Sequence, residues 1–117
     1  MAKYECRLRG DFDRLLSSVE NGIISGSVSA SLEDQSTYTD NGVKCAVRVF
    51  ERYSILGGNR VSLNITLIGN NDSLFLSAIT SGGSRAMFFK LNTLGEESFL
   101  DKLIDIVENF KNTSSGN

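Results

Sequence analysis

The chain has 117 residues, of which 40% are hydrophobic and 22% are charged, so its size and composition fit one globular domain. Its formal net charge of −2 argues against nucleic-acid binding, which needs a surplus of Lys and Arg to neutralise phosphates. The chain has no histidine and two distant cysteines, Cys6 and Cys45, so it lacks the residues of an ordinary zinc site and the usual general base at neutral pH. We therefore expect no metal, no cofactor and no catalysis.

The sequence also predicts where the protein resides. The first residues alternate between polar and apolar side chains instead of forming the apolar run of a secretory signal. No apolar run approaches the ~20 residues that a membrane-spanning helix needs. We expect a cytoplasmic protein without membrane contact, whose two thiols stay reduced.

The amino-terminal part of the chain predicts a strand followed by a helix. The first ten residues alternate, with Tyr4, Cys6 and Leu8 on one face, which is typical of a half-buried strand. Asp11 is placed to cap a helix that ends near Gly22. The apolar residues of this helix recur every three or four positions: Phe12, Leu15, Leu16, Val19 and Ile23.

The middle of the chain predicts four strands separated by turns. The second strand is centred on Val28, Ala30 and Leu32, and a polar loop then runs from 33 to 42 and ends in an Asp-Asn-Gly turn. The side chains expected to face the helices are, on the third strand, Val43, Cys45, Val47 and Val49; on the fourth, Val61, Leu63, Ile65 and Leu67; and on the fifth, Leu74, Leu76 and Ala78. Whether a sixth strand forms at 85–90 stays open.

The end of the chain predicts a long amphipathic helix. Thr93 and Glu96 have the spacing of a capping box at its start. An apolar stripe follows at helical spacing: Phe99, Leu100, Leu103, Ile104, Val107 and Phe110. We place residues 1–111 in a single domain and 112–117 in a flexible tail. The predicted fold class is α+β, a curved antiparallel sheet of five to six strands in the order β-α-β-β-β-β(-β)-α, with both helices packed on one face.

This order of elements, closed by a helix that begins with NTLGEE at 92–97, resembles the TBP-like or helix-grip arrangement. The resemblance implies the plan of Bet v 1-like proteins, which bind ligands. Four segments also resemble a family of small uncharacterised proteins from Gram-positive bacteria, which has no assigned activity and no catalytic residues to carry over. These segments are SASLED at 29–34, ERYS at 51–54, GGNRVS at 57–62 and AITSGGS at 78–84.

Basic and glycine-rich segments form the candidate ligand site. Arg48 and Arg52 share the face of the third strand expected to point away from the helices, and Arg60 follows the next turn. Guanidinium groups there could clamp a carboxylate or phosphate, or form ordinary surface ion pairs. The second part is a loop whose backbone amides could turn toward an anion, although a plain hairpin turn explains it equally well. This loop consists of Ser81, Gly82, Gly83, Ser84 and Arg85.

Apolar side chains also occur on strand positions expected to face solvent. They are Ala46, Phe50, Ile68, Phe75 and Ile79. A contiguous apolar patch on a sheet usually meets a partner, and Phe50, Phe75 and Ile79 cluster if neighbouring strands pair as hairpins. These three residues are the candidate interface of a symmetric homodimer.

Two functions follow from these features. The first is a non-catalytic module that binds a small molecule or an anion in a helix-grip-like cleft. The alternative is a homodimeric structural or regulatory interaction protein that uses the exposed face of its sheet.

Overall fold

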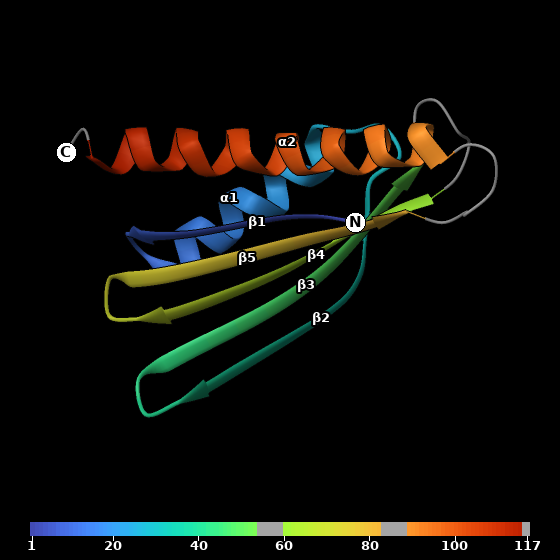
Figure 1. The fold of residues 1–117 in the computed structure, drawn as a ribbon. Coiled ribbons are helices and arrows are strands. Elements are labelled where there is room, and N and C mark those ends of the chain that lie inside the picture. The colour runs from blue at the N-terminus through green and yellow to red at the C-terminus, as the bar shows by residue number, and fades with distance from the viewer. Residues whose placement is uncertain (54–59, 83–88, 116–117) are drawn as a thin grey trace.

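The protein is a five-stranded antiparallel sheet with two helices on one of its faces (Figure 1). The computed structural model describes residues 1–53, 60–82 and 89–115. The elements are β1 (Ala2–Arg9), α1 (Phe12–Ser25), β2 (Ser31–Asp40), β3 (Val43–Tyr53), β4 (Arg60–Asn70), β5 (Ser73–Gly82) and α2 (Phe89–Ser115). The strands lie in the order β1-β5-β4-β3-β2, so the first strand closes one edge beside the last. The predicted α+β class, element order and one-sided helical cover are confirmed.

The second strand occupies the segment that we predicted to be a loop. The predicted strand around Val28 is wrong, because Val28 is fully exposed and precedes β2. β2 pairs with β3 from Ser31 to Asp40, with one register shift between Leu32 and Asp34. Its side chains are almost all exposed, so the alternation that marks a half-buried strand is absent. Backbone hydrogen bonds to β3 define this polar edge strand instead.

Tight turns connect β2 to β3 and β4 to β5. The β2–β3 turn uses Asn41 and Gly42, whose φ angles of 51° and 80° lie in the left-handed region. Asn and Gly tolerate this conformation, which matches the twist of a two-residue hairpin. The predicted Asp-Asn-Gly turn is therefore confirmed. The β4–β5 turn likewise begins with Asn71, at a φ of 58°.

Strand β3 presents the opposite face to the helices from the one we predicted. Ala46 and Phe50 are fully buried beneath the helices, whereas Cys45, Val47 and Val49 are half-buried on the other face. The inward side chains predicted for β4 and β5 are confirmed. Pairing places Phe50 beside Leu63 of β4, so it extends the apolar surface of that strand. The prediction failed because β3 carries apolar residues on both faces.

The carboxyl-terminal helix starts earlier than predicted and has a different beginning. α2 begins at Phe89, so the predicted capping box is wrong, because Thr93 and Glu96 lie inside the helix. Glu96 is buried and forms an ion pair with the Met1 ammonium, at 3.0 Å. The helix also continues through residues 112–115, which we assigned to the tail. Of the undecided sixth strand, 85–88 lie outside the described residues, and Phe89 and Lys90 are helical.

The two helices approach each other closely at Gly22. α1 continues through this residue to Ser25, past the predicted end, and Gly26 caps it. A Cβ atom added to Gly22 would lie 2.6 Å from Cδ1 of Ile106 on α2. The missing side chain thus allows α1 and α2 to pack side by side over the sheet core.

We expect Gly22→Val to lower the free energy of unfolding by about 1–3 kcal/mol, because its side chain overpacks the contact with Ile106. Chemical denaturation measures the change. Ser17→Val, at an exposed position of the same helix, is the matched control and tests helix propensity alone. The double variant Gly22→Val/Ile106→Ala should regain part of the loss. Equal effects of Gly22→Val and Ser17→Val would contradict the close contact.

Candidate functional site

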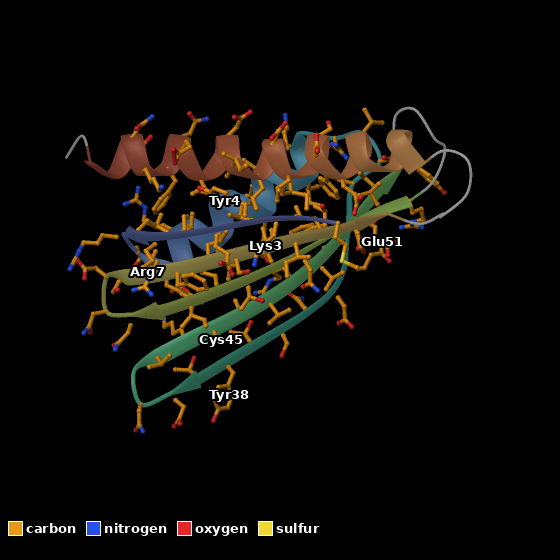
Figure 2. The ribbon with its side chains drawn as sticks, in the orientation of Figure 1. Lys3, Tyr4, Arg7, Tyr38, Cys45 and Glu51 are labelled. Atoms are coloured by element: carbon orange, nitrogen blue, oxygen red, sulfur yellow. The ribbon has the colours of Figure 1, made fainter. Side chains whose placement is uncertain are left out.

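The face of the sheet that points away from both helices is the candidate site, and we call it the open face. The register of the four strand pairs aligns its side chains in rows that cross all five strands. One row consists of Arg7, Phe75, Ile68, Cys45 and Tyr38. A second row consists of Lys3, Ile79, Asn64, Val49 and Asp34. Figure 2 labels Lys3 and Arg7 on β1, at one edge of the sheet, and Cys45 and Tyr38 on the β3–β2 hairpin at the other.

The three middle strands of the open face carry exposed and half-buried apolar side chains. Ile68 is 39% exposed and Ile79 is 42% exposed, although both lie in the middle strands of the sheet. Phe75 lies beside Ile68 and is half-buried, as are Val47 and Val49 on β3. Among the described residues, both helices lie on the opposite side of the sheet from these side chains (Figure 1). Phe75, Ile68, Cys45, Val47 and Val49 form a contiguous apolar patch, whereas Asn64 and Ser77 separate Ile79 from it. Such a patch is typical of a surface that meets another molecule.

The two edges of the open face carry opposite charges. On β1, Lys3, Arg7 and Arg9 point to this face together with one acid, Glu5. On β2, the charged side chains of this face are Asp34 and Asp40. Arg9 also donates to the two carboxylate oxygens of Asp72 at 2.9 and 3.0 Å, a fully solvated contact. The potential therefore changes sign across the sheet, from a basic β1 edge to an acidic β2 edge.

The surface of the described residues is hollowed at several places, two of which bear on the site. One, of about 260 Å³, lies at the end of the open face and is lined by Arg7, Ile68, Asn70, Ser73, Leu74 and Phe75. The other, of about 450 Å³, lies between α1 and α2 and is lined mostly by polar residues. Among the described residues, no group of three or more Cys, Asp and Glu side chains is arranged to hold a metal ion. No helix within the same residues is long and apolar enough to span a membrane.

The structure assembles only part of the predicted interface. Phe75 and Ile79 lie on the open face as expected. The assignment of Phe50 to this face is wrong, because its side chain is fully buried on the helix side. Sequence reasoning also missed Cys45 and Val49, which it placed in the core. Their membership follows from the pairing of Cys45 with Ile68, which a single-strand pattern does not reveal.

The predicted basic cluster is divided between the two faces of the sheet. Arg48 and Arg52 are buried on the helix side, contrary to the prediction that they face away from the helices. Arg60 is exposed on the other face and pairs with Glu51 at 2.7 Å and Glu33 at 3.4 Å. Of the predicted anion loop, Ser81 and Gly82 end β5, and Gly83, Ser84 and Arg85 lie outside the described residues.

Arg48 links α1 to the outer hairpin of the sheet. Its Nε donates to Glu20 of α1 at 2.7 Å. One of its terminal nitrogens donates to the carbonyls of Ser36 and Val47 and to the Thr37 hydroxyl, at 2.9–3.2 Å. Because the guanidinium is buried, these partners are needed to offset its lost hydration.

Arg52 is a buried cation with neutral neighbours. Its two terminal nitrogens donate to the hydroxyls of Ser27, at 2.8 Å, and Ser98, at 3.1 Å, and its guanidinium lies 4.3 Å from the centre of the Phe99 ring. All 14 Asp and Glu residues are in the described part of the chain, and none of them lies within 4.0 Å of Arg52. Burial lowers the pKa of Arg52 from its ordinary value, because a desolvated charge is unfavourable.

Comparison with known proteins identifies a family model and no characterised relative. The model, described as a family of unknown function (DUF6054), matches residues 1–111. None of the curated protein sequences matches the chain.

We expect Glu20→Ala to lower the free energy of unfolding by about 1–3 kcal/mol, because it leaves the buried Arg48 without its charged acceptor. Asp13→Ala is the matched control, since Asp13 also lies on α1 and pairs with a cation of β3, Lys44, at 3.3 Å. That pair is exposed, so its loss should change stability by at most about 0.5 kcal/mol. Urea unfolding of both variants tests the difference. Equal losses would show that Arg48 needs no carboxylate.

Proposed function

We propose that this chain, which belongs to the DUF6054 family of unknown function, is a non-catalytic interaction protein that forms a homodimer through the open face of its sheet. The observation that carries the proposal is the apolar patch of that face, which runs from Phe75 and Ile68 to Val47 and Val49 of β3, with both helices on the opposite side of the sheet (Figure 1). A second sheet packed face to face, about 10 Å away, would remove these side chains from water.

The size of the open face supports a dimer of modest affinity. Five strands about 4.8 Å apart and eight residues at about 3.3 Å each give a face of about 20 Å by 26 Å. Its projected area of about 500 Å² per copy is somewhat below the ~800 Å² per partner of a standard interface. We therefore expect a reversible dimer with a dissociation constant in the micromolar range.

The thiols support a cytoplasmic location. Both cysteines are free and half-buried, and they lie on opposite faces of the sheet: Cys6 beside the core and Cys45 on the open face. A reducing compartment keeps Cys45 a small apolar side chain at the proposed interface.

We expect Phe75→Asp to weaken the dimer at least tenfold, because it puts a charge beside Ile68 in the apolar patch of the interface. Sedimentation equilibrium from low micromolar to sub-millimolar concentration measures the mass relative to the 12.8 kDa chain. Val28→Asp is the matched control, since Val28 is fully exposed between α1 and β2. This variant should dimerise like the wild type. A wild-type protein that stays at one chain mass throughout would contradict the proposal.

The cysteines provide an independent readout of the same dimer. The rate of maleimide labelling at Cys45 should fall as the protein concentration rises, because the partner covers the open face. Cys6 is the internal control, since it packs beside the core on the helix side of β1. Parallel changes at both thiols would indicate a change in folding and not association through the open face.

Arg52 favours a second candidate function, the binding of a small anion under α2. The packing of α2 against the sheet supports this proposal, and so does a buried guanidinium that lacks a carboxylate partner. The Ser27 and Ser98 hydroxyls accept hydrogen bonds from Arg52, so their own O–H groups remain available to donate to a phosphate or carboxylate. Such an anion would offset the cost of the buried charge.

We expect inorganic phosphate or citrate to raise the melting temperature of the wild type above that in NaCl of equal ionic strength. Arg52→Met should abolish this rise, whereas Arg60→Met should keep it, since Arg60 is exposed and already paired with two acids. The rise is compared within each variant, so a change in basal stability does not affect it. Equal melting temperatures in NaCl and in the anions, or a rise that survives Arg52→Met, would exclude this site.

A further inference from the structure

The charge pattern of the open face specifies how a second copy would lie on it. Each row of the sheet that ends in a base on β1 can be followed across the strand pairs to β2. The row of Lys3 ends at Asp34, and the row of Arg9 ends at Asp40. The row of Arg7 ends at Tyr38, an aromatic ring. In each of these three rows, a cation on the β1 edge therefore stands across the sheet from a carboxylate or an aromatic ring on the β2 edge.

Two simple two-fold arrangements bring identical sheets face to face. An axis parallel to the strands, above the central strand β4, places β1 of one copy over β2 of the other and keeps every row opposite itself. An axis across the strands places β1 over β1 and β2 over β2. The first arrangement joins edges of opposite charge, and the second joins edges of like charge.

We infer that the homodimer has its two-fold axis parallel to the strands, so that Lys3 meets the partner's Asp34, and Arg9, which also pairs with Asp72 of its own chain, lies opposite the partner's Asp40. This inference rests on the homodimer proposed above. The same operation places Ile79 over the partner's Val49, and it stacks Ile68 on its own copy. Apolar residues therefore meet apolar residues in the same arrangement that pairs the charges.

Two further facing pairs fit the same arrangement. Arg7 lies opposite the partner's Tyr38, where a guanidinium can stack on the phenol ring. Phe75 lies opposite the partner's Cys45, which is small enough to accept an aromatic ring. Two sheets that pack face to face keep their strands within about 30° of one another, and a two-fold axis along β4 keeps the two central strands aligned.

The charged pairs would determine orientation more than affinity. They lie at the rim of the interface, where solvent weakens each pair, and like charges in the same positions repel. The two-fold axis repeats every contact, so one substitution changes two pairs at once. The arrangement with its axis across the strands brings the β1 cations of both copies together, and their repulsion disfavours it.

A charge exchange between two variants tests the orientation. Lys3→Asp sets the introduced carboxylate against the partner's Asp34 twice in its own dimer, and Asp34→Lys sets the introduced ammonium against the partner's Lys3 twice. We expect each variant alone to dimerise at least tenfold more weakly than the wild type. An equimolar mixture should form a heterodimer with near wild-type affinity. In it, the introduced carboxylate faces the introduced ammonium, and the remaining Lys3 faces the remaining Asp34, so both pairs join opposite charges. Sedimentation equilibrium with one variant carrying a fluorescent label measures the mixture.

Matched controls carry the same charge changes on the helix side of the protein. Arg14→Asp on α1 and Asp105→Lys on α2 are exposed and lie away from the open face. They should dimerise like the wild type. Added NaCl should strengthen the homodimers of Lys3→Asp and Asp34→Lys, since it screens their repulsion, and should weaken the heterodimer.

The possible failures are distinguishable. If Phe75→Asp abolishes the dimer but Lys3→Asp strengthens it, the open face is the interface and the axis runs across the strands, which overturns the inference alone. If the variants dimerise like the wild type and the mixture gains nothing, the charged edges do not face each other, and the inference is again overturned. If the wild type is monomeric throughout, or Phe75→Asp has no effect, the proposed function itself fails.

Discussion

The helices of this protein bring enough apolar surface to cover one face of a five-stranded sheet, and they leave the other face bare. Phe99 and Leu103 of α2 and Leu15 of α1 pack with the inward side chains of β4 and β5 into one buried cluster. The hairpin of β2 and β3 extends beyond this cover (Figure 1). One-sided burial therefore decides which strands are apolar, which edge is polar, and which surface is available to a partner.

Arginines occupy the boundary between the helical cover and the outer hairpin. Their long stems pack against the core while their charged ends reach polar groups, so they suit positions that are buried but not apolar. Arg48 ends on the carboxylate of Glu20 and on three acceptors of the outer hairpin. Arg52 ends on two serine hydroxyls and the Phe99 ring. The Arg48–Glu20 pair is electrically neutral, whereas Arg52 and its hydroxyl partners carry an excess positive charge. The proposed anion would therefore offset the charge of Arg52 and not that of Arg48.

The candidate interface was partly predictable from the sequence. Phe75 and Ile79 alternate with the core residues of β5, so their place on the open face follows from the two-residue period of a strand. β3 has valines on one face and Ala46, Phe50 and two arginines on the other, so hydrophobicity favoured the wrong face. Local pattern cannot resolve such a strand, because the deciding quantity is the contact of Phe50 with its neighbours.

Residue spacing along the chain was enough to predict the fold class, the order of the elements and the apolar stripes of both helices. These features depend on the spacing of apolar and polar residues over a few positions, which can be read from the amino-acid sequence. Long-range pairing, in contrast, makes residues 31–40 a strand, turns the arginines of β3 inward, and sets the basic β1 edge opposite the acidic β2 edge. Each of these depends on which strands pair and in what register. Those choices are made by contacts between residues far apart in the chain.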